Sequence, residues 1–189
     1  MSALSVLIAD EAAALPLHLV VESDYAHWLA GQDDAVRTQI LAQRFEGRRY
    51  TSAVWYDRSG EVAGAVVGAR AADDVWALGA LPYALPERSY RLADALPAGV
   101  QQRLALGYAL GAYQYTRYKP KAQRAPARLV LADAAAREQQ LRIAAAVHGA
   151  RDWVNTPTED LGPEHIEDAV SALAAAHGAQ VHTIVGEAL

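Results

Sequence analysis

The chain has 189 residues, of which 52% are hydrophobic and 21% are charged, and its formal net charge is -5. This length suits one domain, or one domain with a piece of the next, and the composition is globular rather than disordered. The sequence contains no cysteine, which excludes disulfides, thiolate metal sites and cysteine nucleophiles. Its acidic balance argues against a dedicated nucleic-acid binder.

No membrane or export signal is evident. The apolar run after Met1 is interrupted by Asp10 and Glu11, and no basic stretch precedes it. No segment approaches the roughly 18 apolar residues of a membrane helix. We therefore expect a soluble, cytoplasmic protein with no membrane partner.

Strands and short helices alternate in the first half of the sequence. A short helix is expected from Asp24, its N-cap, to Gly31. A longer helix opens at Asp33 or Asp34 and stops at Gly47, with its apolar stripe at Val36, Ile40, Leu41 and Phe45. The predicted strands cover 4–8, 15–21, 51–56, 61–69, 75–78 and 90–92, and the first two are short apolar runs rich in branched residues. Residues 57–60 have turn chemistry and predict a β-hairpin.

Longer helices follow in the second half. Residues 98–115 predict a helix whose Gly107 and Gly111 allow close packing on a sheet. Residues 119–126 form a polar linker, and residues 129–131 predict a strand. Asp133 caps a helix to residue 154 with the apolar stripe Ile143, Val147, Ala150 and Val154.

The last predicted helix runs from Pro163 to Gly178, with Ile166, Val170, Leu173 and His177 on one face. Residues 181–185 predict a strand. The element order indicates an α/β fold, a mixed sheet with flanking helices, followed by an incomplete second αβ unit.

The search for catalytic motifs is negative. The sequence has no His-Glu-x-x-His, no Gly-x-Ser-x-Gly and no phosphate-binding glycine loop. An acidic and imidazole cluster could ligate a metal, but its residues suit a first helical turn better: Glu164, His165, Glu167 and Asp168. Gly60, Gly64 and Gly68 recur within a predicted strand, which favours packing or bulge roles.

A basic and aromatic cluster could stack and neutralise nucleic acid. Its members are Tyr113, Tyr115, Arg117, Tyr118, Lys119, Lys121, Arg124 and Arg128. A helix end followed by a solvated linker explains the same residues, and we favour that interpretation.

Residues 150–157 read Ala-Arg-Asp-Trp-Val-Asn-Thr-Pro, and residues 160–163 read Asp-Leu-Gly-Pro. This passage resembles the leucyl (cytosol) aminopeptidase family, whose members carry Arg-Asp-Leu-Val-Asn-Thr-Pro and then Asn-Asp-Leu/Met-Gly-Pro. The sequence differs at Trp153, where leucine is usual, and at Glu159, where asparagine is common. Residues 106–113 and 185–189 also resemble the family, and the likeness weakens before residue 104.

The resemblance implies three parts: a macrodomain-like α/β domain over residues 1–131, a linking helix over 132–157, and the incomplete start of a catalytic domain over 158–189. In the family, that catalytic domain binds two divalent metals (zinc, manganese or magnesium), which activate water to release N-terminal residues from peptides. The usual assembly is a hexamer.

The family's ligand-bearing phrases, Val-Gly-Lys-Gly and Asn-Thr-Asp-Ala-Glu-Gly-Arg, have no counterpart in these 189 residues. We therefore assign no catalytic, cofactor-binding or metal residue, and we expect Asn155, Thr156 and Pro157 to be structural. The expected partners are the missing catalytic domain, further copies of the chain and, through the parent enzyme, a peptide.

Three hypotheses remain. The chain is a non-catalytic portion of an aminopeptidase; it is a free-standing module that binds nucleic acid or an ADP-ribose-like ligand; or it shapes an assembly and shields the catalytic chamber. The second rests on fold analogy alone, and the acidic charge counts against it.

Overall fold

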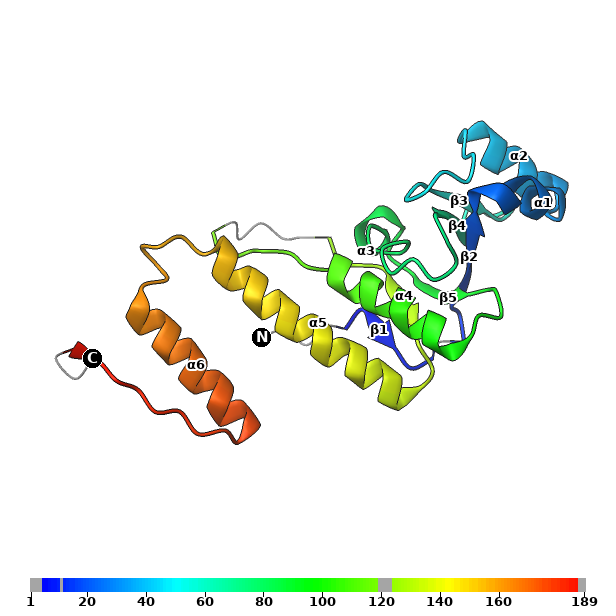
Figure 1. Cartoon of the computed structure of the whole chain (residues 1–189). Helices are drawn as coiled ribbons and strands as arrows, with labels where there is room; N and C mark the ends of the chain where they lie inside the picture. Colours follow the sequence, from blue (N-terminus) through cyan, green and yellow to red (C-terminus); the bar gives the residue numbers. More distant parts are fainter. Residues whose placement is uncertain (1–4, 11, 119–123, 187–189) are drawn as a thin grey trace. The chain divides into compact units, whose positions relative to one another are not determined.

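A mixed sheet with helices on both faces organises the first part of the chain in the computed structural model, which describes residues 5–10, 12–118 and 124–186 (Figure 1). The strands are β1 (Leu7–Ile8), β2 (Leu15–Val21), β3 (Ser52–Tyr56), β4 (Val62–Ala69), β5 (Ser89–Leu92) and β6 (Arg128–Val130). Across the described sheet their order is β1-β6-β5-β2-β4-β3. Only the β3–β4 pair is antiparallel among these pairings; the others are parallel.

Helices separate the strands along the chain. They are α1 (Tyr25–Ala30, after a short 3-10 turn), α2 (Asp34–Ala42), α3 (Leu81–Ala84), α4 (Ala98–Gly111), α5 (Ala134–Asn155) and α6 (Pro163–His177). The predicted fold class, an α/β mixed sheet with flanking helices, is therefore confirmed. Along the described chain, no helix is both long and apolar enough to cross a bilayer.

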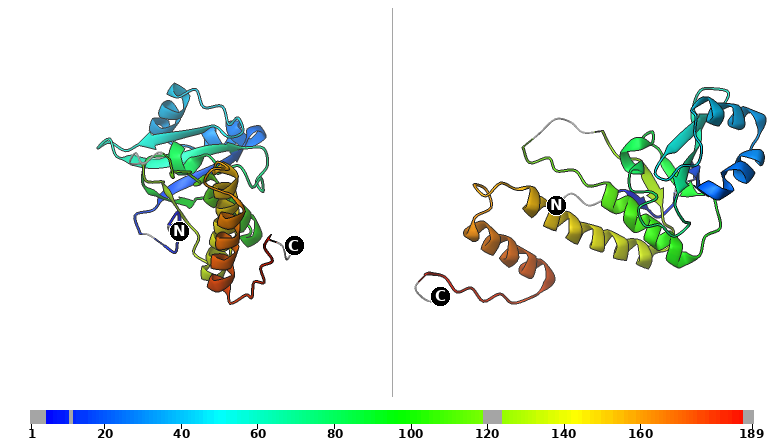
Figure 2. Two further views of the ribbon diagram at one scale, coloured as in Figure 1. Left: turned by 90° about the vertical axis from the view of Figure 1, so that its left-hand side faces the viewer. Right: turned by 45° about the horizontal axis from the view of Figure 1, so that its top comes forward.

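Helices cover both faces of the sheet (Figure 2), and the sheet separates two hydrophobic cores. One core packs Leu17 and Tyr90 of the sheet against Leu104 and Tyr108 of α4 and against the start of α5. The other packs Val20 and neighbouring strand residues against α1 and α2. Alternate residues of β2 enter opposite cores because successive strand side chains point to opposite faces.

The hairpin of β3 and β4 confirms the turn predicted at residues 57–60. The Asp57 carboxylate accepts hydrogen bonds from the backbone N–H groups of Ser59, at 2.8 Å, and Glu61, at 3.1 Å, and from the Ser59 hydroxyl, at 2.6 Å. These bonds, above all the one from the Ser59 hydroxyl, hold the pKa of Asp57 below its ordinary value. Gly60 follows at φ +84°, a conformation that L side chains rarely adopt.

Two predicted strands are wrong. Residues 75–78 form turns instead, with Ala77 and Leu78 buried against α4. Residues 181–185 are extended but unpaired in the described structure, and they are exposed. Both segments have the apolar content of a strand, but neither has a neighbouring edge to bond with. The predicted strand at 4–8 is shorter, Leu7–Ile8, and Leu4 lies outside the described residues.

Two helices end earlier than predicted. Helix α2 stops at Ala42 rather than near Gly47, and Phe45 fills its core from the following loop. Leu41, expected on the apolar stripe, is 54% exposed. Helix α4 ends at Gly111 rather than at residue 115.

The stripe predicted for α5 is confirmed at Val147, which packs against the core, and is wrong at Ile143 and Val154. Its buried residues are Ala136, Gln140 and Ala144, whereas Ile143 and Val154 are 40% and 85% exposed. The cap was predicted correctly: the Ala136 N–H donates to the Asp133 carboxylate at 3.0 Å. The core side of α5 therefore combines Ala136, Gln140 and Ala144 with the partly buried Leu141 and Val147.

The described chain divides into two compact units, residues 1–148 and 149–189. The first contains the sheet and most of α5. The second contains the end of α5, helix α6 and the extended segment that follows it.

Candidate functional site

The acidic and imidazole cluster of residues 164–168 lies at the start of α6. The His165 ring accepts a hydrogen bond from the Gly162 N–H at 3.1 Å and so caps the helix. Glu164 and Asp168 are exposed. In the part of the chain that the structure describes, no three His, Asp or Glu side chains gather as a metal ion would require.

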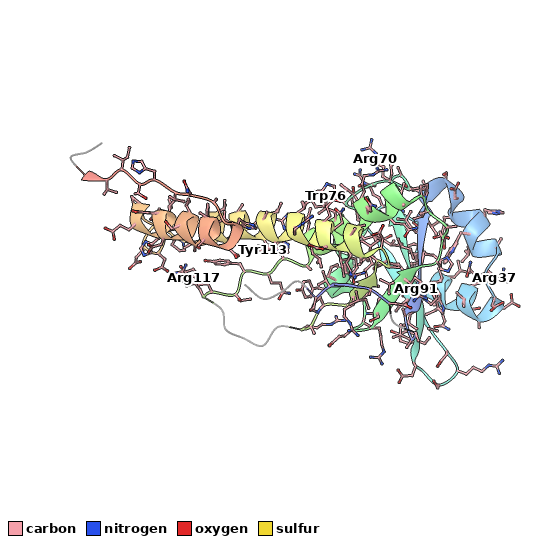
Figure 3. The ribbon with its side chains drawn as sticks, turned by 90° about the horizontal axis from the view of Figure 1, so that it is seen from below. Arg37, Arg70, Trp76, Arg91, Tyr113 and Arg117 are labelled. Atoms are coloured by element: carbon pink, nitrogen blue, oxygen red, sulfur yellow. The ribbon has the colours of Figure 1, made fainter. Side chains whose placement is uncertain are left out.

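The basic and aromatic cluster is divided among separate partners. Tyr113 packs against His148 of α5, with ring centroids 5.1 Å apart, and Figure 3 shows Tyr113 and Arg117 beyond the end of α4. Arg117 lies over the Tyr118 ring at 5.6 Å. Arg124 donates instead to the backbone carbonyls of Tyr83 and Leu85. Lys119 and Lys121 lie outside the described residues.

Close packing explains two of the recurring glycines, as predicted. A β-carbon at Gly64 would lie 2.1 Å from the Trp55 ring, and one at Gly68 would lie 2.1 Å from the Arg48 carbonyl oxygen. These positions therefore serve the packing of β4.

The segment that carries the family resemblance ends α5. The Thr156 hydroxyl donates to the Asp152 carbonyl at 2.6 Å, and so satisfies a carbonyl at the helix end. This geometry agrees with the structural role expected for Thr156, and Pro157 follows where the helix has ended.

An apolar face is exposed on the second unit. Ile166, Val170 and Leu173 of α6 are 44%, 38% and 49% exposed. They were predicted to share one helix face, and their spacing places them there, but nothing described within this unit buries them. Val181, Ile184 and Val185 are also exposed, so apolar surface extends along the following segment. We call these six residues the unit-two apolar face.

The carboxyl ends of β2 and β5 bring together a group that the sequence analysis missed. His18 of β2 lies with its Nδ1 atom 3.7 Å from an Asp94 carboxylate oxygen, and the Leu19 N–H donates to the same carboxylate at 3.1 Å. The His18 side chain chiefly, and the Leu19 N–H as well, hold the pKa of Asp94 below its ordinary value, against the opposing effect of burial. The His18 ring also contacts Trp28 and Trp55, at centroid distances of 5.7 and 5.9 Å.

A cleft of about 400 Å³ opens beside this group. Its walls are the end of β2 (Leu19 to Val21), Trp28 of α1 and Leu96 after β5, and Asp24 lies among them. The sequence offered one indication of this site, because Asp24 and Asp94 each lie shortly after the end of a predicted strand.

Comparison with known proteins connects this fold to one family. The sequence model of the M17 aminopeptidase N-terminal domain matches residues 15–132, which include strands β2 to β6. The chain belongs to the M17 aminopeptidase family.

Two curated relatives, from Streptomyces coelicolor and Streptomyces avermitilis, are both named "Probable cytosol aminopeptidase". The first is 32% identical over 156 residues, which is 69% of this chain and 27% of the relative. The second is 32% identical over 145 residues, 69% of this chain and 25% of the relative. The chain thus spans about a quarter of the length of the curated relatives it matches.

Solved structures agree with this M17 assignment. The cytosol aminopeptidase of Coxiella burnetii superposes with a TM-score of 0.85 at 25% identity, covering 96% of this chain and 40% of that one. The bottromycin maturation enzyme BotP, solved in complex with Mn, shares the fold with a TM-score of 0.70 at 23% identity, covering 94% of this chain and 39% of that one.

Proposed function

We propose that the chain is the N-terminal portion of a leucyl-type aminopeptidase and is not itself catalytic. The observation that carries this proposal is the M17 N-terminal match over residues 15–132, in a chain that spans only about a quarter of its curated relatives. In this scheme residues 1–131 form the N-terminal domain, 132–157 the linking helix and 158–189 the start of the catalytic domain.

The reaction that we propose for the longer protein is removal of N-terminal residues from peptides, with two divalent metals (zinc, manganese or magnesium) supplying the activated water. The relative BotP was solved with Mn, which supports a metal in that protein. The described residues gather no ligand set for such a centre, so we derive no catalytic step from them.

The unit-two apolar face supports the missing-domain part of the proposal. Soluble proteins rarely leave a contiguous apolar surface uncovered unless it has a partner. The occupant that we propose is the rest of the catalytic domain, which would cover α6 and pair the extended segment at residues 181–185.

The role proposed for the sheet domain is to shape a homo-oligomer, a hexamer in the cytoplasm, and to shield its catalytic chamber. Deletion of residues 1–131 from the longer protein should change the oligomer mass measured by light scattering. An unchanged mass would count against the assembly role.

Activity provides the direct test of the non-catalytic role. The purified 189-residue chain, supplied with Mn²⁺ or Zn²⁺, should not hydrolyse leucine-p-nitroanilide, whereas the longer protein should. The proposal would be overturned if the hydrolytic activity eluted together with the 189-residue chain in size-exclusion chromatography.

A second test uses the unit-two apolar face. Leu173→Ala should cost little stability in the 189-residue chain, where Leu173 is 49% exposed. In the longer protein the same change should cost about 2–5 kcal/mol, because it would leave a cavity in a covered interface. Equal losses of stability in both proteins would contradict the proposal that the rest of the catalytic domain covers this face.

A further inference from the structure

The carboxyl edge of the sheet contains a topological switch point between β2 and β5. These strands are adjacent and parallel, with Leu15 opposite Tyr90. The chain leaves β2 for α1 and α2, which cover one face, and leaves β5 for α4, which covers the other. Open α/β sheets bind ligands in the crevice at such a point, because diverging connections leave a gap there.

The cleft described above lies at this switch point. Its lining comes from the end of β2, from α1 and from the segments after β4 and β5. Its volume of about 400 Å³ is sufficient for a small molecule. The walls formed by Leu19, Trp28 and Leu96 are apolar, which favours an apolar ligand body.

The charged side chains in and beside the cleft limit the chemical class of ligand that it can bind. The residues that line the cleft include no lysine or arginine; its two ionisable side chains are the carboxylate of Asp24 and the imidazole of His27, which is neutral above its ordinary titration range. Asp24 is exposed and its side chain does not cap α1; its carboxylate accepts a hydrogen bond from the Ser23 hydroxyl at 3.0 Å. Asp94, which follows β5, accepts a hydrogen bond from the Leu19 N–H of β2. Because its pKa is lowered, it keeps a second negative charge beside this part of β2. Phosphate-bearing ligands would be repelled, and an ammonium group would be attracted.

We propose that this cleft binds a small molecule that joins an apolar or aromatic body to a primary ammonium group. The body packs between Trp28, Leu19 and Leu96, and the ammonium group pairs with the Asp24 carboxylate. Trp28 also offers an indole ring, the aromatic surface that attracts cations most strongly. This site is independent of the proposed peptidase reaction, which requires residues outside the described chain.

The test is binding of 2-phenylethylamine to the 189-residue chain at pH 7.5, followed through the indole N–H resonances of its four tryptophans by NMR. Trp28→Phe identifies the Trp28 resonance. The amine should shift that resonance saturably and leave the Trp153 resonance unchanged. The neutral isostere 2-phenylethanol should bind about fivefold more weakly, the factor expected for one ion pair near 4 Å in water. ADP-ribose should not bind.

Matched variants separate the site from general electrostatics. Asp24→Asn should weaken amine binding by about fivefold and reduce its salt dependence. Glu87→Gln removes the same charge from an exposed residue before β5, at the opposite edge of the sheet, and should leave binding unchanged. Ala72→Leu adds bulk to an exposed residue of the cleft lining and should abolish binding in a folded protein.

Three results would overturn the proposal. They are a Trp28 resonance that no amine shifts, equal binding of the amine and the alcohol, and binding of ADP-ribose at this resonance. The last result would favour the ADP-ribose-like hypothesis instead.

Discussion

Gly107 of α4 lies against the backbone of Val75: a β-carbon at Gly107 would stand 1.6 Å from the Val75 carbonyl oxygen. Gly111, one turn later, stands in the same relation to the Gly79 carbonyl, at 1.7 Å. The two glycines were predicted to allow close packing on a sheet. The close packing is confirmed, but the partner is the turn segment after β4, in the region where Figure 3 labels Trp76.

Gly107→Ala should therefore destabilise the fold. The methyl group meets backbone that cannot rotate away, so α4 must shift, and we expect a loss of about 3 kcal/mol in the free energy of unfolding. Gly149→Ala is the control, because a β-carbon at this helical glycine meets nothing within 4 Å. It should stabilise the chain by up to about 1 kcal/mol. Urea unfolding of both variants measures these changes in the free energy of unfolding. Equal changes at the two positions would contradict the proposed close contact of Gly107 with the Val75 backbone.

The buried tyrosines Tyr90 and Tyr108 differ in whether the hydroxyl group has a hydrogen-bond partner. Both are fully buried, and burial raises the pKa of Tyr90 to about 12 and that of Tyr108 further above its ordinary value. The Tyr90 hydroxyl donates to the Pro86 carbonyl at 3.2 Å, whereas the Tyr108 hydroxyl has no hydrogen-bond partner among the described residues.

Tyr90→Phe should cost about 1 kcal/mol, because it leaves the Pro86 carbonyl without its donor. Tyr108→Phe should cost nothing or stabilise the protein by about 1 kcal/mol, since it removes a buried polar group that is unsatisfied. Thermal unfolding of the pair gives the comparison. A Tyr108→Phe variant less stable than Tyr90→Phe would show that its hydroxyl is satisfied.

The cap of α5 can be compared with that of α2. Asp133 accepts a hydrogen bond from the Ala136 N–H at 3.0 Å, whereas Asp33 precedes α2 without any side-chain cap bond. Asp133→Ala should cost about 1 kcal/mol of unfolding free energy and Asp33→Ala clearly less. If chemical denaturation gave equal losses, the cap bond would not account for the cost at Asp133.

Asp94 should make stability depend on pH. Because its pKa is lower in the folded protein than in the unfolded chain, its contribution is present above the ordinary aspartate range and is lost as pH falls through the folded pKa. Asp94→Asn keeps an acceptor for the Leu19 N–H but removes the charge. The stability gap between the wild type and this variant should be largest near neutral pH and shrink below pH ~4. A gap that is constant from pH 7 to pH 3 would contradict the assignment.

Local chemistry made much of the fold predictable. The strand at Leu15–Val21, the Asp57 turn, the Asp133 cap and the end of α6 at Gly178 all follow from residues within a few positions of one another. The family resemblance was equally local, because it rests on the continuous run at residues 150–163.

The wrong predictions share a different cause, because they concern contacts between segments that are far apart in the sequence. Residues 75–78 and 181–185 have strand-like composition, yet a strand forms only where another edge can accept its hydrogen bonds. The stripe of α5 failed in part because Ala136, Gln140 and Ala144 are its buried residues while Ile143 remains exposed. The cleft could not be foreseen because Trp28 and Leu96 are far apart in the sequence and meet only at the ends of neighbouring strands.

The sequence by itself determined the family, the α/β class and the helix and turn boundaries that depend on short-range hydrogen bonds. Tertiary structure alone decided which apolar residues are buried, which glycines carry the close contacts, and that His18 meets Asp94 beside the cleft that Asp24 lines. The physical reason is that caps and turns are satisfied within a few residues, whereas burial and site formation depend on strand order, which joins segments far apart along the chain.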